Sequence, residues 1–218
     1  MNRSPEIIIN FSGAHGLPGH HGEHGANAFL FGISGSPGHH GHCGSPGISA
    51  LPIQVKIASE GEVIAIREAK GLAYMLAMGQ SANSLRVLSN GGKGGDGGRG
   101  GDGGSGAMGF RGSDATRYSS GTNGGPGGNG GDGGDGGDVG HGGNGADIMV
   151  NVKYEDTDLL MVITEHQQWA GAGGSGGGGG NGGHGGPGGL GGSSYSWTTT
   201  HRNADGTESS TTHTNSGG

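Results

Sequence analysis

The stretch GGKGGDGGRGGDGGSG, residues 91–106, decides how this chain folds, because glycine pairs recur there on a strict period of three. The same Gly-Gly-X period returns at residues 124–145, with one lapse at Val139, and again at residues 173–192. A polyproline-II-type helix has three residues per turn and no internal hydrogen bonds. A flexible linker has no reason to hold this period, so the repeats predict a bundle of polyglycine-II helices.

Two earlier blocks, residues 13–25 and 32–47, carry one glycine per three residues instead of two. In a three-fold helix, a residue and the third residue after it share one edge. A Gly-Gly-X helix therefore offers two bare edges to its neighbours and shows X to solvent. Valine at Gly130 or Gly182 is accordingly expected to clash, whereas asparagine at Asp135 is expected to cost little. The turn at residues 26–31 is expected to bury its aromatic side chains.

Short apolar stretches between the glycine blocks alternate as β-strands do. Strands are expected at residues 6–11, 53–58, 63–67, 72–78, 85–88, 148–152 and 159–164. For residues 72–78 a short helix is the alternative, and the glycines that bound the stretch closely favour a strand. The stretches 53–58 and 63–67 are predicted to pair as a hairpin, and so are 148–152 and 159–164. The Ser/Thr-rich stretches 195–201 and 207–214 flank the turn signal Asp205-Gly206, which favours a third hairpin or else a disordered tail.

The predicted fold class is a polyglycine-II helix bundle with a small all-β portion and little or no α-helix. Residues 1–193 are assigned to the bundle, with β-hairpins inserted at residues 51–90 and 147–168, and residues 194–218 to the polar tail. Two other interpretations of the glycine blocks stay open. A collagen triple helix is disfavoured by the scarcity of proline, and a disordered chain by the strict period.

The Gly-Gly-X blocks resemble those of polyglycine-II sandwich proteins, among them the snow flea antifreeze protein and the adhesin tips of some phage long tail fibres. The stretches SDATRYSSGTNGGPGGNGG and GGSSYSWT also resemble segments of large uncharacterised glycine-rich proteins. The first resemblance covers about half of the chain. It implies the helix type, and it adds ice binding and receptor binding to the functions worth testing.

Composition and charge restrict the partners. The 218 residues include 61 glycines and carry a net charge of -7, which argues against nucleic acid because phosphate binding needs a basic surface. A single cysteine, Cys43, excludes an internal disulfide framework. No apolar run approaches the roughly 18 residues of a membrane span, and the N-terminus lacks the apolar run of a signal peptide. We therefore expect a soluble chain, cytoplasmic or released without a leader.

Twelve histidines raise the question of a metal site. The residues on which such a site would draw are His21 and His24 in the first block and His39 and His42 in the second. Neighbours on one helix edge are about 9 Å apart, too far to share one ion whose bonds to nitrogen are about 2 Å. Exposed histidines explain the pattern without a metal, so no metal or cofactor is expected.

Catalysis has little support, because Cys43 and His42 point to different edges and nothing orients them as a catalytic pair needs. No enzymatic activity is expected. The leading interpretation is a structural or interaction module, a rigid scaffold that displays loops to a protein, a cell surface or another copy of itself, alone or within a longer protein. Irregular loops carry binding residues more often than rigid elements do. The candidate partner-binding residues are Phe110, Arg111, Arg117, Tyr118, Tyr195 and Trp197.

Two alternatives accompany this interpretation. A receptor-binding adhesin predicts that loop substitutions abolish binding while the fold survives. An ice-binding protein needs a flat face of small, regularly spaced residues, and the Asp, Asn, His and Lys residues at the X positions count against it.

Overall fold

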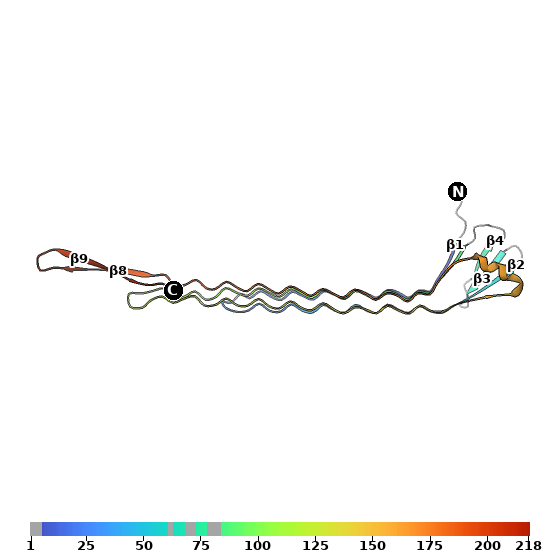
Figure 1. Ribbon diagram of the computed structural model, residues 1–218, viewed down its shortest axis with the longest axis horizontal. Helices are drawn as coiled ribbons and strands as arrows, with labels where there is room; N and C mark the ends of the chain where they lie inside the picture. Colours follow the sequence, from blue (N-terminus) through green and yellow to red (C-terminus); the bar gives the residue numbers. More distant parts are fainter. Residues whose placement is uncertain (1–5, 61–62, 69–72, 78–83) are drawn as a thin grey trace, which may run out of the picture. The chain divides into compact units, whose positions relative to one another are not determined.

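The computed structural model describes residues 6–60, 63–68, 73–77 and 84–218. Within these ranges the regular secondary structure is nine β-strands in three sheets and one 3-10 helix (Figure 1), which confirms the expectation of little helix. The chain forms two compact units. The first comprises Met1–His20, His42–Gly98 and Gly137–Gly177, and the second comprises His21–Gly41, Arg99–Gly136 and Gly178–Gly218.

The first unit contains two sheets. One is wholly parallel, in the order β1 (Glu6–Asn10), β5 (Ser84–Leu88) and β7 (Ile163–Gln167). The other is mixed, in the order β4 (Ala73–Ala77), β3 (Val63–Glu68), β2 (Ile53–Glu60) and β6 (Ile148–Val152). The strands β2 and β3 form the predicted antiparallel hairpin, whereas β2 and β6 run parallel. The strand expected at 72–78 corresponds to β4, and residues 72 and 78 lie outside the described residues.

The core of the first unit is an apolar cluster to which both sheets contribute. Ile53, Val55 and Ile57 alternate inward along β2, and Leu85 and Val87 do so along β5. All five side chains are almost completely buried. Because burial of apolar surface is the main favourable term in folding, this cluster gives the β-strands a stability that the glycine-rich sequence does not supply.

The predicted hairpin over residues 147–168 is wrong. Residues 154–162 form a 3-10 helix, η1 (Tyr154–Val162), in place of a turn and most of a strand. The reason is that β6 pairs with β2 in one sheet and β7 pairs with β5 in the other, so the intervening residues connect two sheets. Leu159 of η1 enters the apolar cluster, and Ser59 Oγ donates a 2.6 Å hydrogen bond to the buried carboxylate of Asp156.

Five glycine segments, residues 12–28, 33–50, 90–115, 121–146 and 170–193, contribute to both units without forming regular helices or strands. Within each unit they run side by side (Figure 1) and are joined by backbone hydrogen bonds at every third residue. The first segment donates to the third, the third to the fifth and the second to the fourth, each with a constant offset along the chain. A second set of bonds joins each segment to the one before it.

These ladders define the order of the segments within each unit. The first, third and fifth segments run in one direction, and the second and fourth run in the other. The third segment is bonded to all four others, as in the bonds of Gly101 N to His39 O, Gly103 N to Asn181 O, and Gly134 N to Gly101 O, each 2.8 Å long. It is therefore the centre of the arrangement.

Close backbone contact explains most of the glycines. A Cβ atom at Gly130 would lie well inside 3.0 Å of the carbonyl oxygen of Gly183, as the sequence predicted. The same expectation is wrong for Gly182, where a Cβ would have nothing nearer than Gly131 O at 3.9 Å. Gly182 lies on an outward edge of the fifth segment, and the order of the segments, which determines this, is not readable from the repeats.

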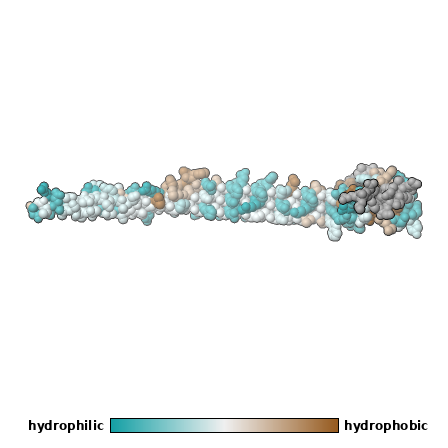
Figure 2. Space-filling model, turned by 90° about the horizontal axis from the view of Figure 1, so that it is seen from above, coloured by the Kyte–Doolittle hydropathy of each residue, from teal (hydrophilic) through white to brown (hydrophobic). Residues whose placement is uncertain are grey.

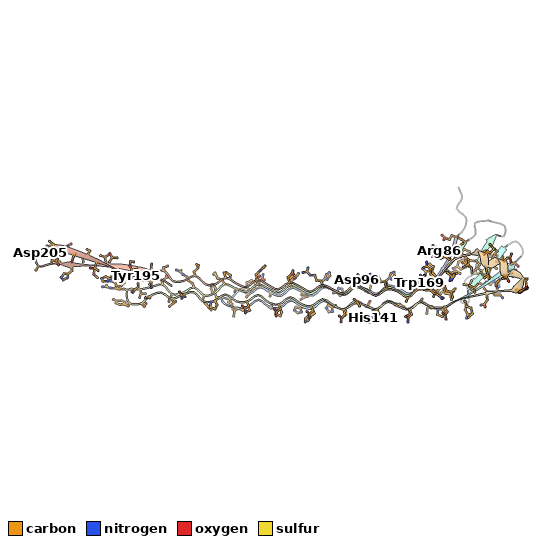
Figure 3. The ribbon with its side chains drawn as sticks, in the orientation of Figure 1. Arg86, Asp96, His141, Trp169, Tyr195 and Asp205 are labelled. Carbon is orange, nitrogen blue, oxygen red and sulfur yellow. The ribbon has the colours of Figure 1, made fainter. Side chains whose placement is uncertain are left out.

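Side chains at the X positions project outward from the glycine segments (Figure 3), and Asp132 and Asp135 are exposed. In the second unit, residues 194–218 form the hairpin of β8 (Tyr195–Arg202) and β9 (Glu208–Asn215), the ordered alternative for the polar tail. Gly206, with φ of 87°, makes the turn between the two strands.

Candidate functional site

Many X side chains accept hydrogen bonds from a parallel neighbouring segment. The Nδ1 atoms of His21 and His24 accept from the backbone N–H groups of Arg99 and Asp102 at 2.8 and 2.9 Å. His15, Asn27, Ser34, His40 and Ser49 accept from X-position amides in the same way. Among the described residues, the backbone N–H groups of these X residues donate to no carbonyl of a neighbouring segment. The side-chain caps supply that acceptor, which gives the histidines a structural role that their period alone did not reveal.

The third segment caps the fifth with carboxylates. The backbone N–H groups of Ser175, Asn181 and Ser193 donate at 2.7 Å to Asp96, Asp102 and Asp114 respectively. These bonds, helped by the nearby charges of Lys93, Arg99 and Arg111, hold the pKa of each carboxyl below its usual value. The carboxylates are therefore charged acceptors that join two segments.

The four histidines considered for a metal site are not brought together. His21 and His24 are engaged as caps, and the ring of His42 lies edge-on to His20 with centroids 6.3 Å apart. His39 contributes its backbone to the ladder between the first and second segments. In the part of the chain that the structure describes, no group of three His, Cys, Asp or Glu side chains could hold one metal ion.

An aromatic face lies on one side of the β8–β9 hairpin, in the second unit. Trp197 pairs with His213 across the strands, and their rings stack with centroids 5.1 Å apart. Tyr195, at the start of β8 (Figure 3), also stacks with Trp197, with ring centroids 5.9 Å apart. The opposite side of the hairpin carries hydroxyl pairs such as Ser196 with Thr214, at 2.8 Å.

The loop that follows the third segment lies against this aromatic face. The guanidinium carbon of Arg117 is 5.9 Å from the centre of the Trp197 ring, within the range of a cation–π contact. Asn215 of β9 donates a 2.7 Å hydrogen bond to the carbonyl of Thr116 and so fixes the loop to the hairpin. Tyr118, at the tip of the loop, is 89% exposed.

The structure thus brings three of the six predicted partner-binding residues into contact, Arg117, Tyr195 and Trp197, and Tyr118 follows Arg117 in the same loop with its side chain exposed. Arg111 instead pairs with Asp114 at 3.0 Å, and Phe110 packs against Phe31 at 5.7 Å. Sequence reasoning missed His213. The register around the Asp205-Gly206 turn, which pairs Trp197 with His213, is the signal that could have found it.

A second exposed surface surrounds the turn between the first and second segments. The prediction that this turn buries its aromatic residues is wrong, because Phe29 is 92% exposed and Leu30 and Ile33 are also exposed. The turn reverses the chain at a segment end, outside the apolar cluster that forms the core of the first unit. With Phe31 and Phe110 it forms the apolar turn patch, and Figure 2 shows hydrophobic side chains gathered on an otherwise pale and hydrophilic surface.

The first unit has a hollow of about 320 Å³ beside β5, β6 and β7. Its lining includes the apolar side chains Val87, Val150 and Ile163 together with His166 and Gln168. The volume is at the lower limit of small-molecule sites. Among the described residues that line it, His166 is the one titratable side chain, and no nucleophile lies beside a base there.

Comparisons with protein-family models, with curated proteins and with solved structures gave no match for this chain. In the described ranges, no helix combines the length and the apolar character that a bilayer span requires.

Proposed function

We propose that the five glycine segments are polyglycine-II helices and that the chain is a non-enzymatic structural and interaction module. The period-three ladders support the helix type, since such helices bond to their neighbours and not internally. Positive φ angles occur only at Gly32 and Gly206 among the described residues, so the segments keep the φ sign of polyproline II. The backbone contacts at Gly130 and its equivalents support a rigid scaffold.

The surface that this scaffold presents to a protein or cell-surface partner is the aromatic face with its loop: Arg117, Tyr118, Tyr195, Trp197 and His213. Tyrosine, tryptophan and arginine carry a large share of the binding energy in protein interfaces. The positions of Trp197 and Arg117 are fixed by stacking and by the Asn215 bond before any partner arrives. This preorganisation lowers the entropy lost on binding and is the observation that carries the proposal.

The proposal also excludes catalysis. The carboxyls with a lowered pKa either cap the backbone of a neighbouring segment or, at Asp205, accept hydrogen bonds from Thr207 in the hairpin turn. Such shifts stabilise the ordinary charged form and do not prepare a proton donor or a nucleophile. Perturbed groups in this chain therefore serve the scaffold.

The test is binding of the labelled chain to a panel of intact cells and to an array of immobilised proteins. The double variant Arg117→Ala/Trp197→Ala is expected to lose at least about tenfold in affinity, the loss typical of interface anchors. The matched control is Tyr154→Ala, which removes an exposed tyrosine of η1 in the other unit. Equal binding by wild type and the double variant would contradict the aromatic face as the binding surface.

The apolar turn patch favours a second candidate, a receptor-binding adhesin. Isolated exposed apolar residues are common, but contiguous exposed ones mark interaction sites. In this case Phe29→Ser/Leu30→Ser abolishes binding to intact cells while the fold survives, and Met161→Ser, an exposed apolar change in η1, does not. Loss of binding in Arg117→Ala/Trp197→Ala identifies the aromatic face as the binding surface. Loss of binding in Phe29→Ser/Leu30→Ser identifies the apolar turn patch instead.

A further inference from the structure

In the second unit, the first, second and third segments each use one row of backbone N–H groups to bond the segment two places later in the chain, and the fourth segment is the exception. In the first segment, Gly22 and Gly25 donate to the third, and in the second segment, Gly35 and Gly38 donate to the fourth. In the third segment, the equivalent row from Gly100 to Gly112 donates to the fifth at every step. Each segment thus uses one row of N–H groups to hold the segment two places later in the chain.

The fourth segment has the same row but almost no acceptors for it. Gly121 N donates to Ser216 O at 2.9 Å. The next N–H groups in the row, those of Gly124, Gly127, Gly130 and Gly133, have no acceptor in the part of the chain that the structure describes. They are partly exposed to solvent. The row is therefore satisfied at one end and open along the rest.

The fifth segment presents a matching row of acceptors. Gly192 O accepts from Gly218 N at 2.9 Å, whereas the carbonyls of Gly189, Gly186 and Gly183 accept no bond from the described residues. Residues 216–218 therefore occupy one end of a groove between the fourth and fifth segments, bonded to both. Beyond them the same donors and acceptors continue at steps of three, without a hydrogen bond from the described residues.

The fifth segment also carries glycine at positions where no close backbone contact within the described chain requires it. A Cβ at Gly191 would lie well inside 3.0 Å of Gly218 O, so glycine is required at that position. At Gly188, Gly185, Gly182 and Gly179, in the same row, a Cβ would meet nothing nearer than 3.7 Å. Glycine is the residue that loses most conformational freedom on folding. Its recurrence at every third position of this row therefore points to a backbone that approaches these positions as Gly218 approaches Gly191.

We propose that this groove binds a sixth polyglycine-II segment of the repeat X-Gly-Gly, parallel to the fourth segment and antiparallel to the fifth. Residues Ser216, Gly217 and Gly218 are its template, with Ser216 at X. A Cβ at either Gly217 or Gly218 would overlap backbone of the fourth or fifth segment, so the occupant needs two glycines in every three residues. Its partner is thus defined as a glycine-repeat polypeptide. The inference rests on the proposed helix bundle. It gives that bundle an edge of unbonded N–H and C=O groups, comparable to the unpaired edge strand of a β-sheet to which a further strand can bind.

The experiment is amide hydrogen exchange by NMR on the full chain, with and without a synthetic peptide of four Ser-Gly-Gly repeats. Exchange at Gly124, Gly127, Gly130 and Gly133 is expected to slow about tenfold with the peptide, because each gains a hydrogen bond. Gly131 and Gly134, already bonded to the third segment, report the bundle itself and are expected to be protected throughout. Unprotected Gly131 and Gly134 would refute the bundle, and protection there without a peptide effect would refute the groove alone.

Matched variants locate the effect. Gly182→Leu places a side chain on the groove row, where its Cβ would meet nothing nearer than Gly131 O at 3.9 Å, and is expected to abolish the peptide effect. His184→Leu places the same side chain on the exposed X row of the same segment and is expected to preserve it. A peptide of equal composition with the period of three broken is expected not to bind, and equal binding by it would overturn the proposal. Protection of the four amides in a dimer without peptide would also overturn it, by assigning the groove to a second copy.

Discussion

The β-sandwich of the first unit and the glycine segments both bond neighbours through the backbone, but they differ in what fills the space between them. In the sandwich, side chains such as Ile57, which is 0% exposed, fill the space between two sheets. Along the glycine rows of adjacent segments, backbone meets backbone directly, and most side chains project outward. One region loses stability when a side chain is removed, and the other when a single methyl group is added.

The sharpest test of this difference is Gly101→Ala. Its Cβ would overlap Glu23 O, a backbone atom of the first segment that cannot rotate away. Because the third segment is bonded on every side, we expect a loss of about 4 kcal/mol or more in the free energy of unfolding. Guanidinium unfolding followed by circular dichroism measures it. A loss below about 1 kcal/mol would mean that the segments separate easily, and the comparison with a packed core would fail.

The opposite change tests the sandwich. Ile57→Ala leaves a cavity among Val55, Ile66 and their neighbours and is expected to cost about 2–5 kcal/mol, whereas Ile57→Val costs about 1 kcal/mol. The same unfolding assay applies. If both variants cost equally little, the apolar cluster is not what stabilises the first unit.

A smaller effect is expected from pH. The pKa of Asp96, Asp102 and Asp114 is lowered in the folded chain, chiefly by backbone N–H donors of the fifth segment. A lowered folded pKa gives stability that is present above the unfolded value of about 3.9 and is lost as pH falls through the folded value. The wild type should therefore lose stability as the pH falls below about 4.

The variant that isolates this effect is Asp102→Asn. Its amide oxygen still accepts from Asn181 N, as Asn90 does from Trp169 N at 2.8 Å, but it does not titrate. Its unfolding midpoint is expected to fall less than that of wild type on acidification. Asp132→Asn, at an exposed X position that makes no capping bond, is the control for charge alone. An identical acid response in all three proteins would remove the capping explanation.

The smallest expected effect has the opposite sign. Gly182→Ala adds a methyl group that would meet no atom nearer than Gly131 O at 3.9 Å, an ordinary van der Waals distance, at a position where φ is not positive. Alanine restricts the unfolded chain, so the free energy of unfolding should rise by about 0.5 kcal/mol. Calorimetry of this variant beside Gly101→Ala compares one substitution on two edges. If Gly182→Ala also destabilises strongly, the edge assignment of the fifth segment is wrong.

Much of this arrangement was readable from the sequence, because a strict period carries geometric information. The repeat identified which glycines could meet a neighbour, alternation found β2, β3 and β6, and the Asp205-Gly206 turn signal gave the polar hairpin as one of two alternatives. The repeat did not give the order of the segments, so Gly182 was placed on an inner edge. Pairing across two sheets replaced the expected second hairpin with η1, since tertiary contacts override local pattern there.

The candidate site was readable in part for the same reason. Sequence reasoning identified aromatic and basic residues in irregular stretches, namely Arg117, Tyr118, Tyr195 and Trp197. The contact of Arg117 with the Trp197 ring depends on the hairpin lying beside the loop, where Asn215 bonds to Thr116. Nothing local encodes that contact. The capping histidines were equally hidden, because their bonds join residues in different segments.

The constant offset between bonded segments gives this protein something like a reading frame. Deleting one residue inside the third segment would move every later X side chain of that segment into the row of Gly95 and Gly101, where a Cβ overlaps the backbone of the first segment. Deleting a whole Gly-Gly-X triplet would restore the frame and remove one rung. Tolerated changes of length in such a protein should therefore come in multiples of three, a constraint that α-helical and β-sheet proteins do not share.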